Sequence, residues 1–177
     1  MGKNIGQNVM EAVVWRDGEA QTLNREQCVF GYRSSAIKTG GGIILKVVLK
    51  LAKGDRALII KEAQDYLLGR QGKFPPYPSA GSFFKNIKLA DWPNGREMLP
   101  VKYVERGMIP AGWLIEQCAL KGYRVGDAAI SMEHGNFIVN LGDAASEDIL
   151  SVVEKAREEV YNRFRIELEP EVEIVKS

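Results

Sequence analysis

The alternation of apolar and polar positions predicts β-strands in the first third of the chain. Apolar residues recur through 8–15, an Asp-Gly pair at 17–18 marks a hairpin turn, and a second strand follows over 19–23. A glycine triplet at 40–42 precedes a further β-rich run over 43–51. A dinucleotide-binding glycine motif follows a strand and opens a helix, whereas this triplet comes before a strand. We therefore interpret the triplet as a loop.

Apolar residues take up helical spacing after residue 54. Asp55 is placed to cap a helix that Gly69 is placed to end. The apolar stripe of this helix consists of Leu58, Ile59, Ala63, Tyr66 and Leu67. Residues 87–98 are irregular, with a turn at 92–95, and a short helix is predicted over 99–107. Pro110 is predicted to be the first residue of the next helix, which Gly122 ends.

The last third of the chain combines short strands with one long helix. Strands are predicted over 128–131 and 137–141, and Ser146 is predicted to cap the following helix. The apolar face of that helix consists of Ile149, Val152, Val153, Ala156, Val160 and Phe164. A final strand is predicted over 166–175. Because helices and strands do not alternate regularly, the predicted fold class is α+β.

Composition and charge narrow the class of protein. The chain of 177 residues is 45% hydrophobic and 27% charged, which is typical of a soluble globular protein. A formal net charge of +1 offers no basic excess for binding nucleic acid. Cys28 and Cys118 are too few for a disulfide framework and favour a reducing cytosol, and a single histidine leaves no credible zinc set. No apolar run reaches the ~18 residues of a membrane span, and we see no secretory signal. We expect a cytoplasmic protein without metal, membrane or nucleic-acid partners.

Most of the candidate chemistry lies in the stretch 78–86, Pro-Ser-Ala-Gly-Ser-Phe-Phe-Lys-Asn. This stretch follows a proline-rich turn, so its backbone enters extended. Strand alternation predicts that Ser82, Phe84 and Asn86 share one face, and that Phe83 and Lys85 share the other. A hydroxyl and an amide on one face indicate a polar site. The alternative is a core strand with both phenylalanines buried and the serine incidental.

The hexapeptide Gly-Ser-Phe-Phe-Lys-Asn at 81–86 resembles the signature of the UDP-N-acetylenolpyruvoylglucosamine reductase (MurB) family. Five further motifs resemble that family in the same order. They are Phe-Gly-Tyr-Arg-x-Ser at 30–35, Arg-x-x-Lys-x-Pro at 70–75, Ala-Gly-Trp-Leu-Ile-Glu-Gln at 111–117, His-x-Asn-Phe-Ile-Val-Asn at 134–140 and Glu-Pro-Glu-Val at 169–172. Ile87 departs from the family, which usually has proline there.

The resemblance also implies a domain organisation. Only 49 positions separate Arg33 from Ser82, which is similar to the family subclass without an inserted loop that folds a tyrosine over the substrate. Residues 1–76 are expected to be the end of a flavin-binding (VAO/PCMH-like) domain, and residues 77–177 a mixed α+β substrate-binding domain with a final strand carrying the catalytic glutamate. The family's upstream flavin-binding segments match nothing here. We therefore expect this chain to be the C-terminal part of such an enzyme, with the N-terminal flavin-binding half missing. By itself we expect it to be inactive and unable to hold FAD in the family's way.

The resemblance implies an oxidoreductase of bacterial peptidoglycan synthesis, and hence of cell-wall biogenesis, cell shape and cell division. NADPH reduces FAD, the flavin delivers hydride to the enolpyruvyl methylene carbon of UDP-N-acetylglucosamine enolpyruvate, and a proton completes UDP-N-acetylmuramate. Negative charge develops beside the substrate carboxylate during this reaction. The chemistry therefore needs a proton donor and fixed groups around the growing charge.

Three residues match the family's catalytic positions. Ser82 matches the proton donor, and Arg33 matches an arginine that can grip a carboxylate through two parallel hydrogen bonds. Glu171 matches the catalytic glutamate, which can donate a proton if burial near other acids keeps it protonated. Without the motifs, Arg33 would be interpreted as a structural salt-bridge residue and Glu171 as a solvated strand residue.

Three polar residues are predicted to bind the UDP end of the substrate. Arg70, Lys73 and Asn86 offer the cationic and amide donors that diphosphate oxygens accept. A solvated surface before a turn is the alternative for these positions.

Three further residues are assigned to substrate binding or its support. Lys85, with Arg33, is a candidate to stabilise the alkoxide of the proton donor. Tyr32 packs near the flavin or the substrate, or else in the core, and Gln117 is polar support for the site. His134 is interpreted as a loop residue that supports two strands.

Two other classes of protein are weighed against the enzyme portion. One is a stand-alone UDP-sugar-binding module without redox activity. The other is a non-catalytic structural remnant, against which the joint presence of Arg33, Ser82 and Glu171 argues.

Overall fold

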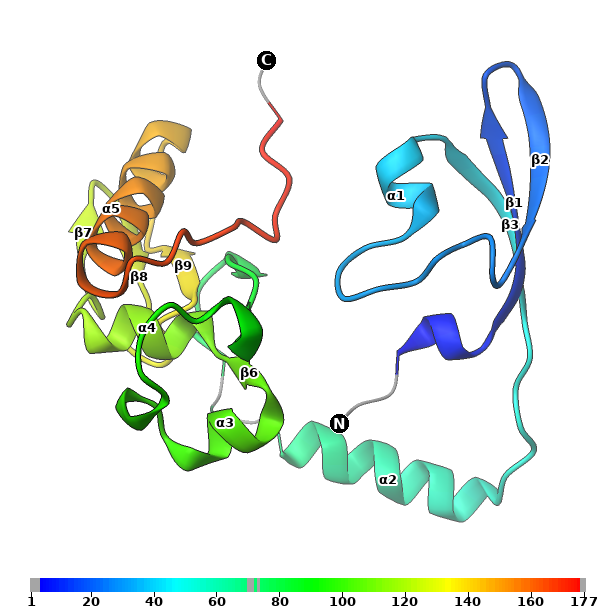
Figure 1. Cartoon of the computed structure of the whole chain (residues 1–177), viewed down its shortest axis with the longest axis horizontal. Coiled ribbons are helices and arrows are strands. Elements are labelled where there is room, and N and C mark those ends of the chain that lie inside the picture. Colours follow the sequence, from blue (N-terminus) through cyan, green and yellow to red (C-terminus); the bar gives the residue numbers. More distant parts are fainter. Residues whose placement is uncertain (1–3, 70–71, 73, 176–177) are drawn as a thin grey trace. The chain divides into compact units, whose positions relative to one another are not determined.

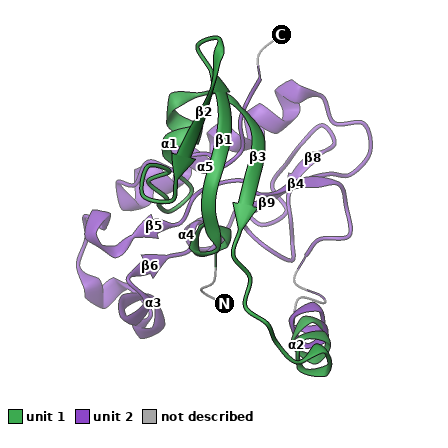
Figure 2. Ribbon diagram, turned by 90° about the vertical axis from the view of Figure 1, so that its right-hand side faces the viewer, with its two compact units in different colours: residues 1–63 green, residues 64–177 purple. Residues whose placement is uncertain are grey.

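The computed structural model describes residues 4–69, 72 and 74–175 of the chain. The chain forms two compact units, Met1–Ala63 and Gln64–Ser177, called the first and the second unit below (Figure 2). Helices and antiparallel strands follow one another in mixed order, which confirms the α+β prediction (Figure 1). A compact unit and a domain need not share their limits, so the boundary predicted between residues 76 and 77 stays a prediction.

An antiparallel sheet forms the first unit. β1 (Val9–Arg16) pairs with β2 (Glu19–Asn24) on one side and with β3 (Ile43–Leu49) on the other, which confirms the three predicted strands. The hairpin turns at Asp17 and Gly18, whose φ angles of 53° and 85° suit a two-residue turn. A short turn, η1 (Ile5–Gln7), precedes the sheet.

The glycine triplet is only partly a loop. α1 (Ala36–Gly40) begins after Ser35, whose hydroxyl accepts a hydrogen bond from the amide of Lys38 at 3.1 Å. Gly41 and Gly42 then turn the chain into β3. The prediction of a loop was therefore wrong for the first glycine, because a serine cap upstream starts a helix that includes it.

The first unit buries little apolar surface. Its small core consists of Ala12, Val14 and Cys28, with Leu23 and Ile37 packed against them. Most of β3 is exposed. So is α2 (Arg56–Leu68), which begins in the first unit and ends in the second, with Leu58 68% and Leu67 67% exposed. Asp55 caps α2 as predicted, since its Oδ1 accepts from the amide of Leu58 at 3.0 Å. The apolar stripe thus predicted the helix correctly, but the described part of the chain does not bury it.

A sheet covered by one long helix forms most of the second unit (Figure 1). Its antiparallel strands lie in the order β4-β9-β8-β7. α5 packs against β7, β8 and β9 and contacts α4. The bounds are β4 (Ser79–Ser82), β7 (Arg124–Val125), β8 (Ala128–Ile130), β9 (Phe137–Asn140), α4 (Ala111–Gln117) and α5 (Ser146–Phe164).

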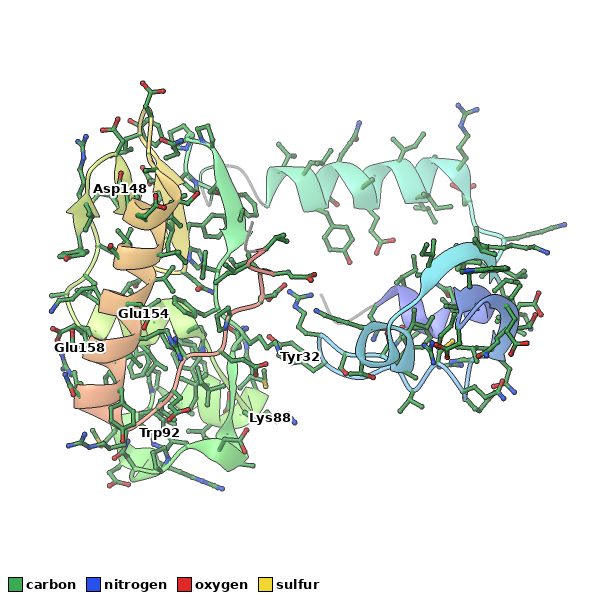
Figure 3. The ribbon with its side chains drawn as sticks, turned by 90° about the horizontal axis from the view of Figure 1, so that it is seen from above. Tyr32, Lys88, Trp92, Asp148, Glu154 and Glu158 are labelled. Atoms are coloured by element: carbon green, nitrogen blue, oxygen red, sulfur yellow. The ribbon has the colours of Figure 1, made fainter. Side chains whose placement is uncertain are left out.

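The predicted apolar face of α5 is confirmed. Val152, Val153, Ala156 and Val160 are at most 1% exposed, and they pack in one cluster with side chains of α4 and β8. The charged side chains Glu154 and Glu158 project from the outer side of the helix (Figure 3). Burial of this face holds α5 against the sheet. The polar stretch at 78–86 begins in β4, a strand of the same sheet.

The remaining short elements connect β4 to α4. β5 (Ile87–Lys88) pairs with β6 (Met108–Ile109), so residues 87–98 are less irregular than predicted because a partner strand 20 residues away supplies the pairing. The predicted helix over 99–107 is present as α3 (Val101–Arg106). Two short turns, η2 (Leu89–Asp91) and η3 (Arg96–Met98), complete the connection.

Three predicted helix limits were wrong. α4 ends at Gln117 and not near Gly122, because Ala119 already takes a left-handed φ of 57°, and Pro110 precedes the first helical residue. Ser146 is the first residue of α5 and does not cap it. The amide of Ala145 instead donates to Oδ2 of Asp148 at 3.1 Å.

The predicted final strand over 166–175 was also wrong. Ile166 and Leu168 are buried on alternate positions as a strand pattern requires, but the segment forms only an isolated bridge, between Pro170 and Phe84. Pro170 has no amide hydrogen, so it cannot extend a ladder. The glutamate at 171 is therefore carried by an extended segment.

A close approach between α4 and the loop at 134–136 supports this arrangement. A Cβ atom on Gly112 would lie 3.0 Å from Cε1 of His134 and 3.2 Å from the amide nitrogen of Asn136. One on Gly135 would lie 2.7 Å from the carbonyl oxygen of Gly112. Glycine is therefore needed at both positions for the helix and the loop to pack directly together.

We expect Gly112→Ala to lower the free energy of unfolding by about 1–2 kcal/mol. Overpacking costs about 1–3 kcal/mol, which outweighs the helix preference of alanine of about 0.5–1 kcal/mol. Urea unfolding of the chain measures the change. Glu158→Ala, on the exposed face of α5, is the control and should stay within about 0.5 kcal/mol of wild type. Unchanged stability of Gly112→Ala would contradict the close packing.

Candidate active site

β4 carries Ser82 and contains an irregularity. Ser79 pairs with Val139 and Ser82 with Phe137, so three steps along β4 face two along β9. Gly81, between them, has a φ of 86°, which glycine adopts readily. Such a bulge places one extra residue on one strand and changes which side chains face the core.

Both phenylalanines that follow the bulge are buried, as the alternative of a core strand required. Phe83 is 5% and Phe84 is 1% exposed, so both faces of the chain are covered here. Their rings contact each other edge to face, with centroids 5.2 Å apart. Ser82 lies half-buried directly before this aromatic pair. The buried aromatic pair therefore anchors the end of β4, one residue from the candidate proton donor.

Asn136 holds the backbone that follows Ser82. It is 4% exposed, its Oδ1 accepts from the amide of Phe84 at 2.9 Å, and its Nδ2 donates to the Phe84 carbonyl at 2.8 Å. Its own carbonyl accepts from the amide of Phe83 at 2.8 Å. Sequence reasoning assigned Asn136 no role, although an amide directly before the apolar run of β9 was a visible signal.

The C-terminal segment lies on the other side of the same residues. The amide of Glu171 donates to the carbonyl of Phe83 at 2.7 Å, and the amide of Lys85 donates to the carbonyl of Glu169 at 2.8 Å. The half-buried Glu171 is thus bound through its backbone to the residue after Ser82. The structure brings together the segments of these two candidate catalytic residues.

Lys85 is tied to the C-terminal segment by charge as well. Its ammonium group forms an ion pair with the carboxylate of Glu169, while its backbone bonds to the same residue. The pairing partly neutralises the cation that was predicted to stabilise an alkoxide. It also reinforces the alignment of the two segments.

Arg33 and Tyr32 belong to the first unit. They follow β2 in a loop where Gly31 and Ser34 form an isolated bridge, and Arg33 takes a left-handed φ of 55°. The guanidinium carbon of Arg33 lies 5.7 Å from the centroid of the Tyr32 ring, and both residues are exposed. The three candidate catalytic residues are therefore divided between the two units.

The other predicted substrate-binding residues have different surroundings. Oδ1 of Asn86 accepts from the amide of Ala111 at 3.2 Å, so Asn86 satisfies a free amide at the start of α4. The backbone carbonyl of Gln117 accepts from Arg163, which places Gln117 beside the end of α5. Arg70 and Lys73 lie outside the described residues.

His134 supports the loop between β8 and β9. Its Nδ1 accepts from the amide of Asn136 at 3.1 Å, so the neutral ring carries its proton on Nε2. Burial lowers the pKa of His134 below its ordinary value of 6.5, whereas the Glu116 carboxylate raises it. Glu116 in turn accepts from the amide of Gly135 at 3.2 Å and pairs with Lys121 at 3.2 Å. These contacts agree with the interpretation of His134 as a loop residue that supports two strands.

A cavity of about 330 Å³ opens beside this loop in the second unit. Two cations of α3, Lys102 and Arg106, face it together with the aromatic rings of Tyr103 and Trp113. The ammonium of Lys102 lies 5.1 Å from the centroid of the Tyr103 ring, and the two aromatic rings are 5.6 Å apart. Pro110, Gly112, Glu116 and His134 complete the lining. Sequence reasoning missed the two cations, which carry no motif.

The cavity lies near the amide that Asn86 binds. Asn86 holds the amide of Ala111, and the residues on either side of Ala111 line the cavity. Two cations and two aromatic rings suit an anionic ligand that contains a flat ring, and the carboxylate of the lining, Glu116, is paired with Lys121 at 3.2 Å. The chemistry of this cavity therefore agrees with a nucleotide.

The described residues of the first unit do not fit FAD, which the resemblance implies. A cavity of about 490 Å³ is lined there by an arginine, a glutamate, the side-chain amides of Asn4 and Gln7, and three small or apolar residues, without the glycine-rich backbone cradle that a dinucleotide diphosphate takes. We derive no step through the flavin from these residues. Across residues 4–69, 72 and 74–175, no three His, Cys, Asp or Glu side chains gather to hold a metal ion, and none of the helices described there is long and apolar enough to cross a membrane.

Fold and site define an α+β domain in which a serine and a glutamate lie on hydrogen-bonded neighbouring segments. Residues 74–175 match the family model of the UDP-N-acetylenolpyruvoylglucosamine reductase C-terminal domain. The chain belongs to the UDP-N-acetylenolpyruvoylglucosamine reductase family.

Individual relatives agree with this assignment. UDP-N-acetylenolpyruvoylglucosamine reductase 2 of Symbiobacterium thermophilum is 39% identical over 175 residues, which cover 98% of this chain and 51% of that protein. The reductase of Thermotoga maritima is 37% identical over 174 residues, which cover 98% of this chain and 55% of that protein. The crystal structure of the Thermus caldophilus reductase (MurB) superposes with a TM-score of 0.72 at 36% identity, covering 95% of this chain and 53% of that one. The chain spans about half the length of the curated relatives it matches.

We expect the stability of the chain to fall as pH drops below about 6.5. The pKa of His134 is lower in the folded chain than in the unfolded chain, so folding favours the neutral ring. The stabilisation that this gives is complete above the pKa of the unfolded chain and is lost as pH falls through the pKa of the folded chain. Protonation would also remove the Nδ1 acceptor for the amide of Asn136. Urea unfolding between about pH 7.5 and pH 5 measures this loss.

The control for this experiment is His134→Gln, which has no titrating group. Its stability should be nearly flat over the same pH range, because the carboxylates with lowered pKa values, Asp127 and Glu133, titrate at lower pH. If the free energy of unfolding fell equally with pH in the variant and in wild type, groups other than His134 would cause the loss of stability.

Proposed function

We propose that this chain supplies the substrate-binding and proton-donating portion of an NADPH-dependent flavoenzyme, UDP-N-acetylmuramate dehydrogenase. Its substrate would be UDP-N-acetylglucosamine enolpyruvate and its product UDP-N-acetylmuramate. One observation carries the proposal. The segments of Ser82 and Glu171, which match the family's proton donor and catalytic glutamate, are joined by a backbone hydrogen bond of 2.7 Å between Glu171 and Phe83.

The proposed proton step uses the hydroxyl of Ser82. On the reduced substrate anion, negative charge lies on the carbon beside the carboxylate, and the Ser82 hydroxyl donates its proton to that carbon. A C–H bond forms, the O–H bond breaks, and the charge passes to the serine oxygen. Arg33 would bind the substrate carboxylate with two parallel hydrogen bonds. Glu171, if protonated, would donate a hydrogen bond to the enolate oxygen.

We propose that the cavity beside α3 and α4 holds the UDP end of the substrate. Lys102 and Arg106 would neutralise the diphosphate, and the rings of Tyr103 and Trp113 would contact the flat base. Asn86 does not line this cavity but binds the amide of Ala111, which stands between two lining residues, so its place at the UDP end also remains a prediction. The same role for Arg70 and Lys73, and a supporting one for Gln117, remain predictions.

The remaining properties of the enzyme belong to the same proposal. FAD and NADPH would bind to a flavin-binding half that joins this chain, and Tyr32 would lie near the flavin or the substrate. The enzyme would act in peptidoglycan synthesis, and thereby in cell shape and division. We propose the bacterial cytoplasm as its location, because Cys28 and Cys118 are free thiols, which a reducing compartment preserves.

A UDP-sugar-binding module without redox activity is the second candidate. The observation that favours it is that the proposed nucleotide cavity is lined by the second unit alone. Binding of UDP by this chain would agree with both candidates. Flavin absorbance of the purified protein and NADPH oxidation with the enolpyruvyl substrate would separate them, since only the enzyme shows both when its flavin-binding half is present.

We expect the double variant Lys102→Ala/Arg106→Ala to bind UDP at least about tenfold more weakly than wild type, because two phosphate-facing charges are lost. Titration calorimetry of this chain with UDP measures the affinity. Lys155→Ala is the control, since its ammonium lies on α5 and pairs with Glu159 at 2.7 Å, away from the cavity lining. Equal affinity of the double variant and wild type would rule out the cavity as the UDP site.

We expect Ser82→Ala to slow substrate reduction about 10²–10⁴-fold in the enzyme that contains this chain, while flavin reduction by NADPH stays unchanged. Stopped-flow measurement of flavin absorbance separates the two half-reactions. Ser79→Ala is a matched control on the same strand, because the Ser79 hydroxyl bonds only locally to the amide of Gly81 at 3.3 Å. Equal losses in both half-reactions would count against Ser82 as proton donor.

A further inference from the structure

Phe84 has its backbone polar groups satisfied by a side chain. Regular pairing between β4 and β9 ends at Ser82 and Phe137, so no strand residue of β9 lies opposite Phe84. Phe84 is 1% exposed, so its amide and carbonyl cannot be left to solvent. The side-chain amide of Asn136 accepts from one and donates to the other, at 2.9 Å and 2.8 Å, and so replaces the missing strand.

The opposite edge of the same segment holds Glu171. The carbonyl of Phe83 and the amide of Lys85 point to the C-terminal segment, where they bond to Glu171 and Glu169. The segment is therefore held from two sides, by Asn136 on one and by the C-terminal segment on the other. A shift of Phe84 away from Asn136 would move the backbone to which Glu171 is bound.

We propose that Asn136 is a positioning residue for the proton step. By pairing with both backbone groups of Phe84, it sets the register of the segment that carries Ser82 against the segment that carries Glu171. This inference rests on the proposed function, because it assigns Asn136 a task in the chemistry of those two residues. In this proposal Asn136 acts through the backbone of Phe84.

Only a neutral amide suits this position. An ionised aspartate accepts hydrogen bonds but cannot donate, so it would face the Phe84 carbonyl with a negative charge and no proton between them. A protonated aspartate carries one donor and one acceptor, and it can reproduce both bonds. Asn136→Asp therefore converts the positioning contact into one that depends on pH, without changing the size of the side chain.

The first measurement is amide hydrogen exchange on this chain, which requires no activity. At about pH 8 we expect the amides of Phe84 and Glu171 in Asn136→Asp to exchange at least tenfold faster than in wild type. At about pH 5 the difference in exchange rate between the variant and wild type should shrink, because burial raises the pKa of the introduced carboxyl group and favours its protonation. Unchanged exchange at both amides, or an equal increase throughout the second unit, would overturn the positioning role.

Asn140→Asp is the matched control, with the same change at the other end of β9. Oδ1 of Asn140 accepts from the amides of Gly142 and Ala144 at 2.9 and 3.0 Å, a role that a carboxylate can also perform. We expect exchange at Phe84 and Glu171 to match wild type in this variant. Should Asn136→Asp not fold, Asn136→Ser tests the same two amides without a charge, and failure of both to fold would show a purely structural role.

The second measurement is kinetic and uses the enzyme that contains this chain. Asn136→Asp should lower kcat for substrate reduction at least tenfold at about pH 8 and less at lower pH, with KM within about threefold of wild type and flavin reduction unchanged. A loss in KM alone would overturn the inference. If Ser82→Ala leaves substrate reduction intact, the proposed function fails, while the exchange result still decides whether Asn136 sets the register.

Discussion

The pair of hydrogen bonds between the Asn136 side chain and the backbone of Phe84 is the contact on which the candidate site depends. A buried peptide without a strand neighbour must find other partners, since an unsatisfied buried amide or carbonyl costs about 1–3 kcal/mol. Here the side chain of Asn136 bonds to both the amide and the carbonyl of Phe84. Because it does so, β4 can leave its neighbour at Ser82 while the following residues turn their other edge to the C-terminal segment.

The hydrophobic cluster of the second unit makes this contact rigid. Ile166 and Leu168 are buried in the cluster under α5, so the extended segment that follows them reaches Phe83 with little freedom. On the opposite side, the absence of a side chain at Gly112 lets α4 press directly on the loop that carries Asn136. A proton donor acts only from a fixed position, so this packing is what would convert a serine and a glutamate into a catalytic pair.

The two units differ in how much of their apolar side-chain surface they bury. The second unit buries a continuous cluster, whereas the first leaves much of β3 and its part of α2, residues 56–63, exposed, including Ile43 at 66% and Leu58 at 68%. Exposed apolar surface of this kind is typical of surfaces that contact further protein. It agrees with the proposal that activity requires a flavin-binding half beyond the residues described here, while the cavity proposed for the nucleotide is lined by the second unit alone.

Local patterns in the sequence determined most of the helices and strands, because periods of 2 and 3.6 residues report which side of an element is apolar. The motifs likewise determined the family and named Ser82 and Glu171. The tertiary structure alone decided the bulge at Gly81, the single bridge in place of a final strand, and the two hydrogen bonds from Asn136 to Phe84. The physical reason is distance along the chain. Asn136 and Phe84 are 52 residues apart, and hydrogen bonds between such residues leave no periodic pattern in the sequence.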